Sequence, residues 1–112
     1  MHLAGPAVLK DMPIPSDAIV SGSPRAAGTE LYLTPDGRTL VGLFTCTPGV
    51  FRFTLEAEEF THLLSGRVTI QPEGGDVIDA RAGDTYVLPA GQDLLIEVHE
   101  TITDIYTTWT DR

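Results

Sequence analysis

The chain has 112 residues, which is the length of a single domain. Seven Lys and Arg residues against sixteen Asp and Glu residues give a formal net charge of −9 at pH 7, so we exclude nucleic acids and anionic membrane surfaces as partners. A single cysteine, Cys46, rules out an intramolecular disulfide and a Cys-rich zinc site, and a reduced, cytoplasmic setting is expected. The start of the chain lacks a signal-peptide pattern, and no apolar run approaches the roughly 18 to 20 residues that span a bilayer.

Residues 1–29 are predicted to form an irregular N-terminal arm. Four prolines, with glycine and serine between them, disfavour regular elements other than a short strand near residues 18–20. The stretch also contains Ala, Val, Leu and Ile residues that a free tail would expose. We therefore expect the arm to pack against the main domain or against a second subunit.

From residue 30 onward, strand and turn signals alternate about every 8 to 12 residues. Turns are predicted at Gly and Pro positions such as Pro35-Asp36-Gly37 and Ser65-Gly66. The extended segments between the turns are residues 30–34, 39–46, 50–54, 59–64, 67–71, 77–80, 85–88, 94–99 and 101–110. No segment has a convincing helical period. The pattern predicts an all-β antiparallel sandwich or barrel, and alone leaves jelly-roll, immunoglobulin-like and other barrels open.

The order of the turns resembles the two signature motifs of the cupin family. The first motif ends in a Glu-x6-Gly step from Glu59 to Gly66, and the second contains Gly83, Pro89 and Gly91 at the expected intervals. The resemblance implies a cupin double-stranded β-helix, a jelly-roll barrel, over residues 30–112. Together with the apolar arm it also implies a homodimer.

A narrower likeness is to the cupin 3 subfamily of small cupins that includes ureidoglycine aminohydrolase. It covers about residues 38–107 and is carried by residues 42–49 with Phe51-Arg52-Phe53 after them, by residues 59–68, and by residues 97–101 with Tyr106 beyond. The aminohydrolase holds manganese with a carboxylate, two histidines and a glutamine. Those positions fall near residues 53, 55, 59 and 94 of this chain, so Glu59 is the one candidate ligand.

The general cupin pattern also leaves Glu59 as the one candidate metal ligand. Its two first-motif histidines fall on Arg52 and Thr54, and its second-motif histidine falls on Leu94. A catalytic divalent metal needs three or four converging N or O ligands. His62 lies three residues from Glu59, so strand alternation sends it to the opposite face. His99 is also expected to point away from the interior. The sequence therefore predicts a degenerate metal site without a cofactor, and manganese or iron is the less favoured alternative.

An interior pocket without metal is the preferred interpretation. In the cupin register, Arg52, Thr54 and Glu59 would project into the same space, where a buried Arg and Glu are tolerated only as a pair. Such a pair offers a fixed cation for a carboxylate or carbonyl and a Glu whose pKa is raised by burial. We therefore predict Glu59 and Arg52 as catalytic residues. The alternative is a structural ion pair that fills the space of a lost metal.

Four further residues are predicted to contact the ligand. Phe44 shares a strand face with Cys46, Thr54 lies beside the predicted pair, and Leu94 suggests a partly apolar substrate. Cys46 would need a neighbouring His base to act as a nucleophile, and the sequence places none there. A small buried strand residue is the preferred interpretation of Cys46.

Three classes of function remain from the sequence. The first is a metal-independent enzyme of the isomerase, cyclase, lyase or dehydratase type that acts on a small metabolite through Glu59 and Arg52. The second is a cupin that binds a small ligand without turnover. The third is a metal-dependent aminohydrolase or oxygenase, against which the missing histidines argue.

Overall fold

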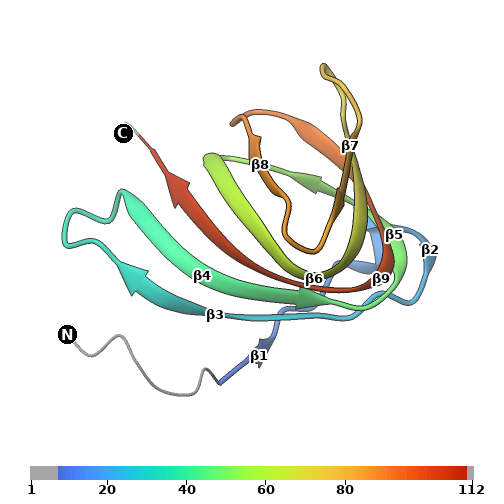
Figure 1. Ribbon diagram of the computed structural model, residues 1–112, viewed down its shortest axis with the longest axis horizontal. Coiled ribbons are helices and arrows are strands. Elements are labelled where there is room, and N and C mark those ends of the chain that lie inside the picture. The colour runs from blue at the N-terminus through green and yellow to red at the C-terminus, as the bar shows by residue number, and fades with distance from the viewer. Residues whose placement is uncertain (1–7, 111–112) are drawn as a thin grey trace.

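The computed structural model describes residues 8–110, and its regular elements are β-strands apart from one short 3-10 helix (Figure 1). The elements are β1 (Lys10–Asp11), a short 3-10 helix η1 (Ser16–Ala18), β2 (Ile19–Gly22), β3 (Ala26–Leu33), β4 (Thr39–Cys46), β5 (Gly49–Thr54), β6 (Glu58–Pro72), β7 (Ile78–Arg81), β8 (Thr85–Leu88) and β9 (Asp93–Trp109). Every strand pair is antiparallel. The predicted all-β fold is confirmed. No helix within residues 8–110 has the length and apolar character needed to cross a membrane.

The strands belong to one sheet that curls on itself (Figure 1). One path through it runs β1-β3-β4-β9-β5-β2, and β6 pairs with β7, β8 and β9. Strand β9 pairs with β4 through its C-terminal half, with β5 through its N-terminal half and with β6 along almost its whole length. The curl therefore brings inward-facing side chains of β4, β5, β6, β8 and β9 into a common interior.

Strands β6 and β9 are longer than the sequence suggested. We expected a turn at Ser65-Gly66, but β6 continues through it with register shifts between Leu63 and Val68. Gly66 has φ 87°, and a Cβ there would collide with the backbone of Thr101 on β9. The glycine thus lets the strand bend sharply against its neighbour without ending.

The N-terminal segment is more regular than expected. Strand β1 pairs with β3, and β2 pairs with β5. Strand β3 begins at Ala26, so the boundary expected after residue 29 falls inside a strand. The backbone N–H of Met12 donates to the carbonyl of Ala26 at 2.9 Å, which holds the segment against the sheet. Residues 1–7 of the predicted arm lie outside the described residues.

The hydrophobic core lies inside the curled sheet. The apolar side chains that are nearly inaccessible to solvent include Cys46, Leu63, Val68 and Leu94. Within residues 8–110, the buried polar residues are Thr61 and Asp104. Buried polar groups are costly without partners, so these two direct attention to the part of the interior where they lie.

Candidate functional site

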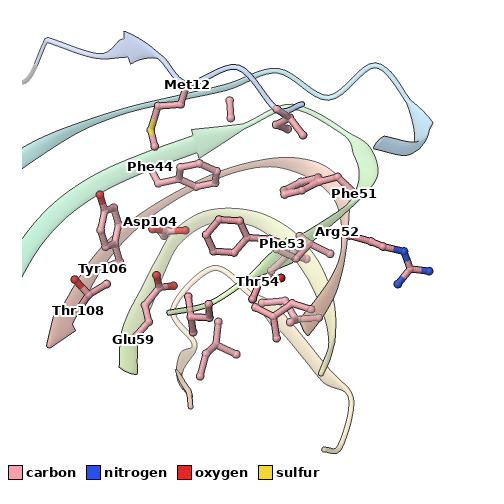
Figure 2. Close-up of a pocket in the computed structure, with 18 of the residues that line it drawn as sticks. Met12, Phe44, Phe51, Arg52, Phe53, Thr54, Glu59, Asp104, Tyr106 and Thr108 are labelled. Carbon is pink, nitrogen blue, oxygen red and sulfur yellow. The ribbon is translucent and has the colours of Figure 1, made fainter. Parts of the chain in front are cut away.

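A pocket with a volume of about 640 Å³ opens into the interior of the curled sheet (Figure 2). This volume is within the range of about 300 to 1,000 Å³ that is typical of small-molecule sites. Its wall is mainly apolar and includes Phe44 on β4, Phe51 and Phe53 on β5, and Tyr86 and Tyr106 on β8 and β9. Met12 and Ile14 of the N-terminal segment also border it. The described part of the wall also includes three acidic residues, of which Glu56 is exposed, whereas Glu59 is partly buried and Asp104 is buried.

Strand β5 has the opposite orientation from the one expected. Phe51 and Phe53 point into the pocket, whereas Arg52 points away from it (Figure 2). The Thr54 hydroxyl donates to Asp93 Oδ1 at 2.6 Å on the exposed side of the strand. Phe53 is 51% exposed because it borders the open pocket.

Arg52, Thr54 and Glu59 all border the pocket, but the structure does not pair Arg52 with Glu59, and the roles predicted for these residues stay predictions. Arg52 is exposed, and the ion pairs among residues 8–110 do not include one between Arg52 and Glu59. The physical reason is the alternation of the strand, because turning the two phenylalanines inward necessarily turns Arg52 and Thr54 outward.

Glu59 is presented by the first half of β6. Its Oε2 accepts a hydrogen bond of 2.9 Å from the hydroxyl of Thr61, the next inward-facing residue. Burial raises the pKa of Glu59, and the hydrogen bond from Thr61 opposes this rise. Glu59 therefore keeps a proton more readily than an exposed glutamate does.

Asp104 is the functional candidate that the sequence interpretation missed. Its side chain projects from β9 beside Phe44, its cross-strand neighbour on β4, and the residue is only 5% exposed. Its Oδ1 is buried and has no hydrogen-bond partner within the described part of the chain. Burial, followed by the negative charge of Glu59, raises the pKa of Asp104 to about 8. The carboxyl is therefore largely protonated at neutral pH.

Two tyrosines extend this polar part of the pocket. Thr61 on β6 lies directly across from Tyr86 on β8 and from Tyr106 on β9. Burial raises the pKa of both phenols, and the charges of Asp104 and Glu59 raise them further. Both phenols are therefore neutral hydrogen-bond donors at physiological pH. The Tyr106 ring lies over Gly42, where any Cβ would collide with it.

The remaining predicted ligand contacts divide into two groups. Phe44 and Leu94 line the pocket. Cys46 is fully buried in the hydrophobic core and is not part of the pocket wall. Burial raises the pKa of its thiol to about 11, which leaves it protonated and unreactive. The structure therefore places Cys46 among packed core residues and not on the described pocket wall, and its contact with a ligand stays a prediction.

The side chains present do not match the metal site of the manganese cupins. His62 lies on the outer face with Nδ1 2.9 Å from Thr85 Oγ1, and His99 Nε2 lies 2.7 Å from Thr69 Oγ1. Residues 8–110 contain no group of three or more His, Cys, Asp or Glu side chains placed to hold an ion. Among residues 8–110, the pocket wall has the carboxyls of Glu56, Glu59 and Asp104 and no imidazole. This donor set does not fit the carboxylate, two histidines and glutamine of the aminohydrolase.

Comparison with solved structures supports the fold. The chain superimposes on a putative ethanolamine utilization protein EutQ of Salmonella typhimurium with a TM-score of 0.71 and 18% identity, over 94% of this chain and 96% of that chain. The EutQ protein of Clostridium difficile gives a TM-score of 0.68 and 22% identity over 78% of this chain. A protein of unknown function from Pseudomonas syringae gives a TM-score of 0.80 and 20% identity over 91% of this chain. The chain spans 64% of the Clostridium protein and 44% of the Pseudomonas protein.

The family assignment comes from the sequence profile of the EutQ-like cupin domain, which matches residues 33–106. No protein of curated function matches the chain. The likeness to ureidoglycine aminohydrolase stays a prediction, whereas the small cupin domain is supported by both the profile and the structural neighbours. The chain therefore belongs to the family of EutQ-like cupin domains.

Proposed function

We propose that this EutQ-like cupin binds a small, largely apolar metabolite in its interior pocket and transforms it without a metal, by proton transfer between the substrate and Glu59 and Asp104. The observation that carries the proposal is that the carboxyl groups of Glu59, which is partly buried, and Asp104, which is buried, share one mainly apolar pocket. Carboxyls that share a site and differ in environment take separate roles, because their pKa values move apart. The reaction class is an isomerisation, cyclisation or elimination.

The roles of the two groups follow from their surroundings. Glu59 receives a hydrogen bond from Thr61 that stabilises its ionised form, so we assign it as the base. Asp104 lacks such a bond and has a pKa of about 8, so we assign it as the acid. In an elimination of water, Glu59 would accept the proton of a C–H bond while Asp104 gives its proton to the departing hydroxyl. A proton must then pass from Glu59 back to Asp104 before the next turnover.

Arg52 has no part in this proposal because its side chain points away from the pocket. A metal-dependent hydrolysis or oxygenation is not favoured either, because the ligands it requires are not assembled among residues 8–110. A protein that binds a ligand without converting it would use the same pocket, and the experiment below distinguishes this alternative from an enzyme.

The test begins with elemental analysis of the untagged protein after exposure to manganese, iron, zinc and nickel. About one equivalent of bound metal would favour a metal-dependent hydrolase or oxygenase over the metal-independent enzyme. The metal-free protein is then mixed with pools of small metabolites, and ligand binding and product formation are followed by NMR. We expect Glu59→Gln and Asp104→Asn each to retain binding of a neutral hit while lowering its turnover by about 100-fold or more, the usual contribution of a general acid or base.

Asp76→Asn is the matched control, because Asp76 is an exposed acid outside the pocket wall and its change removes the same charge. If ligands bind and none is converted, the protein is a binding module. If the two pocket variants turn over a substrate as fast as Asp76→Asn does, the assigned roles are wrong.

A further inference from the structure

The ionisable groups of the pocket wall have an uneven balance of charge. Among the described residues of the wall, the acidic members are Glu56, Glu59 and Asp104, and the basic member is Arg52. The guanidinium of Arg52 is directed away from the pocket, so it does not neutralise the acids inside (Figure 2). The whole chain carries a net charge of −9, which adds to the negative potential of the pocket.

Asp104 provides a second, independent observation. It is nine-tenths buried and directed into the pocket, and its Oδ1 has no partner within residues 8–110. A buried carboxyl oxygen without a partner is costly and is rare in folded proteins. A ligand that donates a hydrogen bond or brings a positive charge would remove this cost, whereas a ligand with only acceptor atoms would not.

The remainder of the wall suits the same kind of ligand. Five aromatic rings border the pocket, those of Phe44, Phe51, Phe53, Tyr86 and Tyr106. Aromatic faces attract an organic cation through their quadrupole and contact its apolar substituents at the same time. Phe44 is also the direct cross-strand neighbour of Asp104, so an aromatic surface and an acid are adjacent at one point of the wall.

We infer that the pocket selects an organic cation, an ammonium compound whose charged group lies beside Asp104 and Glu59 and whose apolar part packs on the surrounding aromatic rings. The inference rests on the proposed function, because it names the substrate class of the same pocket. Carboxylates and phosphates are excluded, since they would place a negative charge next to two acids with no inward-facing cation in the described part of the wall. The charge of Glu59 is balanced by the ligand, and Asp104 supplies the hydrogen-bonding group.

A set of matched probes tests the charge preference directly. Choline, its neutral carbon isostere 3,3-dimethylbutan-1-ol and the anion 3,3-dimethylbutanoate have similar size and differ in charge. Benzyltrimethylammonium with benzyl alcohol and benzoate extends the set to a larger apolar group. Dissociation constants are measured by NMR titration of the metal-free protein at pH 6 and pH 9. Quaternary ammonium groups keep their charge at both values, so any change with pH comes from the protein.

We expect at least one cation to bind at least tenfold more tightly than its neutral and anionic counterparts. Its affinity should increase from pH 6 to pH 9, because Asp104, which faces Glu59, Tyr86 and Tyr106, loses its proton in this interval. Asp104→Asn should remove this increase and reduce the preference for the cation by about tenfold at pH 9, Glu59→Gln should reduce the preference by about tenfold, and Asp76→Asn should leave it unchanged. Thermal unfolding of each variant verifies that it is folded.

Equal or stronger binding of the neutral or anionic probe throughout the set would overturn the inference, as would the absence of binding by every cation. These results are distinguishable from failure of the proposed function. A neutral or anionic metabolite converted through Glu59 and Asp104 would refute the ligand class and retain the catalytic proposal. Tight binding of cations with unaltered turnover in both variants would refute the catalytic proposal and retain the ligand class.

Discussion

Asp104 makes a quantitative prediction about stability. Its pKa is about 8 in the folded protein against an ordinary value of 3.8. Below pH 3.8 the carboxyl is protonated in the folded and unfolded chains, so ionisation costs no stability. As the pH rises from 3.8 to 8, the unfolded chain releases this proton first, and the folded protein loses about 1.4 kcal/mol per pH unit. The loss is about 4 kcal/mol at pH 7 and is complete above pH 8.

Asp104→Asn keeps the shape of the side chain and removes the ionisation. We therefore expect the free energy of unfolding of the variant, relative to wild type, to increase by about 1.4 kcal/mol per pH unit between pH 5 and pH 8. The amide has its own unmet hydrogen bonds, which add an offset that does not change with pH. The slope, and not the value at a single pH, is therefore the diagnostic quantity.

Urea unfolding at half-unit intervals of pH measures this slope, with Asp76→Asn as the control that should show none. Adding Glu59→Gln should shift the response of Asp104 to lower pH, because the charge of Glu59 is the second cause of its raised pKa. Tyr86 and Tyr106 stay protonated throughout the interval and do not contribute. A difference between Asp104→Asn and wild type that is constant from pH 5 to pH 8 would refute the reasoning.

Three other features give direct predictions. Gly42→Ala should lower the free energy of unfolding by about 1 to 3 kcal/mol, because the new methyl collides with the Tyr106 ring. Gly74→Ala, whose methyl would make ordinary contacts only, should change the free energy of unfolding little, and chemical denaturation measures both variants. The thiol of Cys46 should resist a thiol-specific reagent at pH 8 in the folded protein and react at once after unfolding; fast labelling of the native protein would contradict its burial. We also expect a homodimer, so light scattering should give twice the chain mass of 12.1 kDa, and a mass of one chain at micromolar concentration would refute it.

The strand pattern of the chain was readable from its turns. Proline and glycine positions correctly located β4 and β8, because tight turns require particular residues. The same reasoning divided β6 at Gly66 and β9 near residue 100, where the strands in fact bend or continue. A single residue pattern does not distinguish a turn from a bulge, since both use glycine with positive φ.

The pocket was less predictable, for a reason specific to β5. In Phe51-Arg52-Phe53-Thr54 either face of the strand can be turned inward, and the cupin motif suggested Arg52 and Thr54. Simple alternation of apolar and polar residues would have suggested the phenylalanines, which is the orientation found. Asp104 carried a signal of the same kind, because it lies two residues from Ile102, which is buried, on the same face of β9. An acid in phase with core residues indicates a buried carboxyl, but its neighbours on other strands depend on the curl of the sheet.

The pairing of β9 also determines when the protein can acquire its shape during synthesis. Strands β4, β5 and β6 all pair with β9, and residue 58 lies opposite residue 109 at the far end of it. Until the ribosome has made β9, these three strands have unpaired backbone N–H and C=O groups along the edges that β9 will occupy. Such edges invite pairing with other chains. The sheet closes only after β9 has emerged from the ribosome, and the interval before that is when the nascent chain is most prone to aggregate.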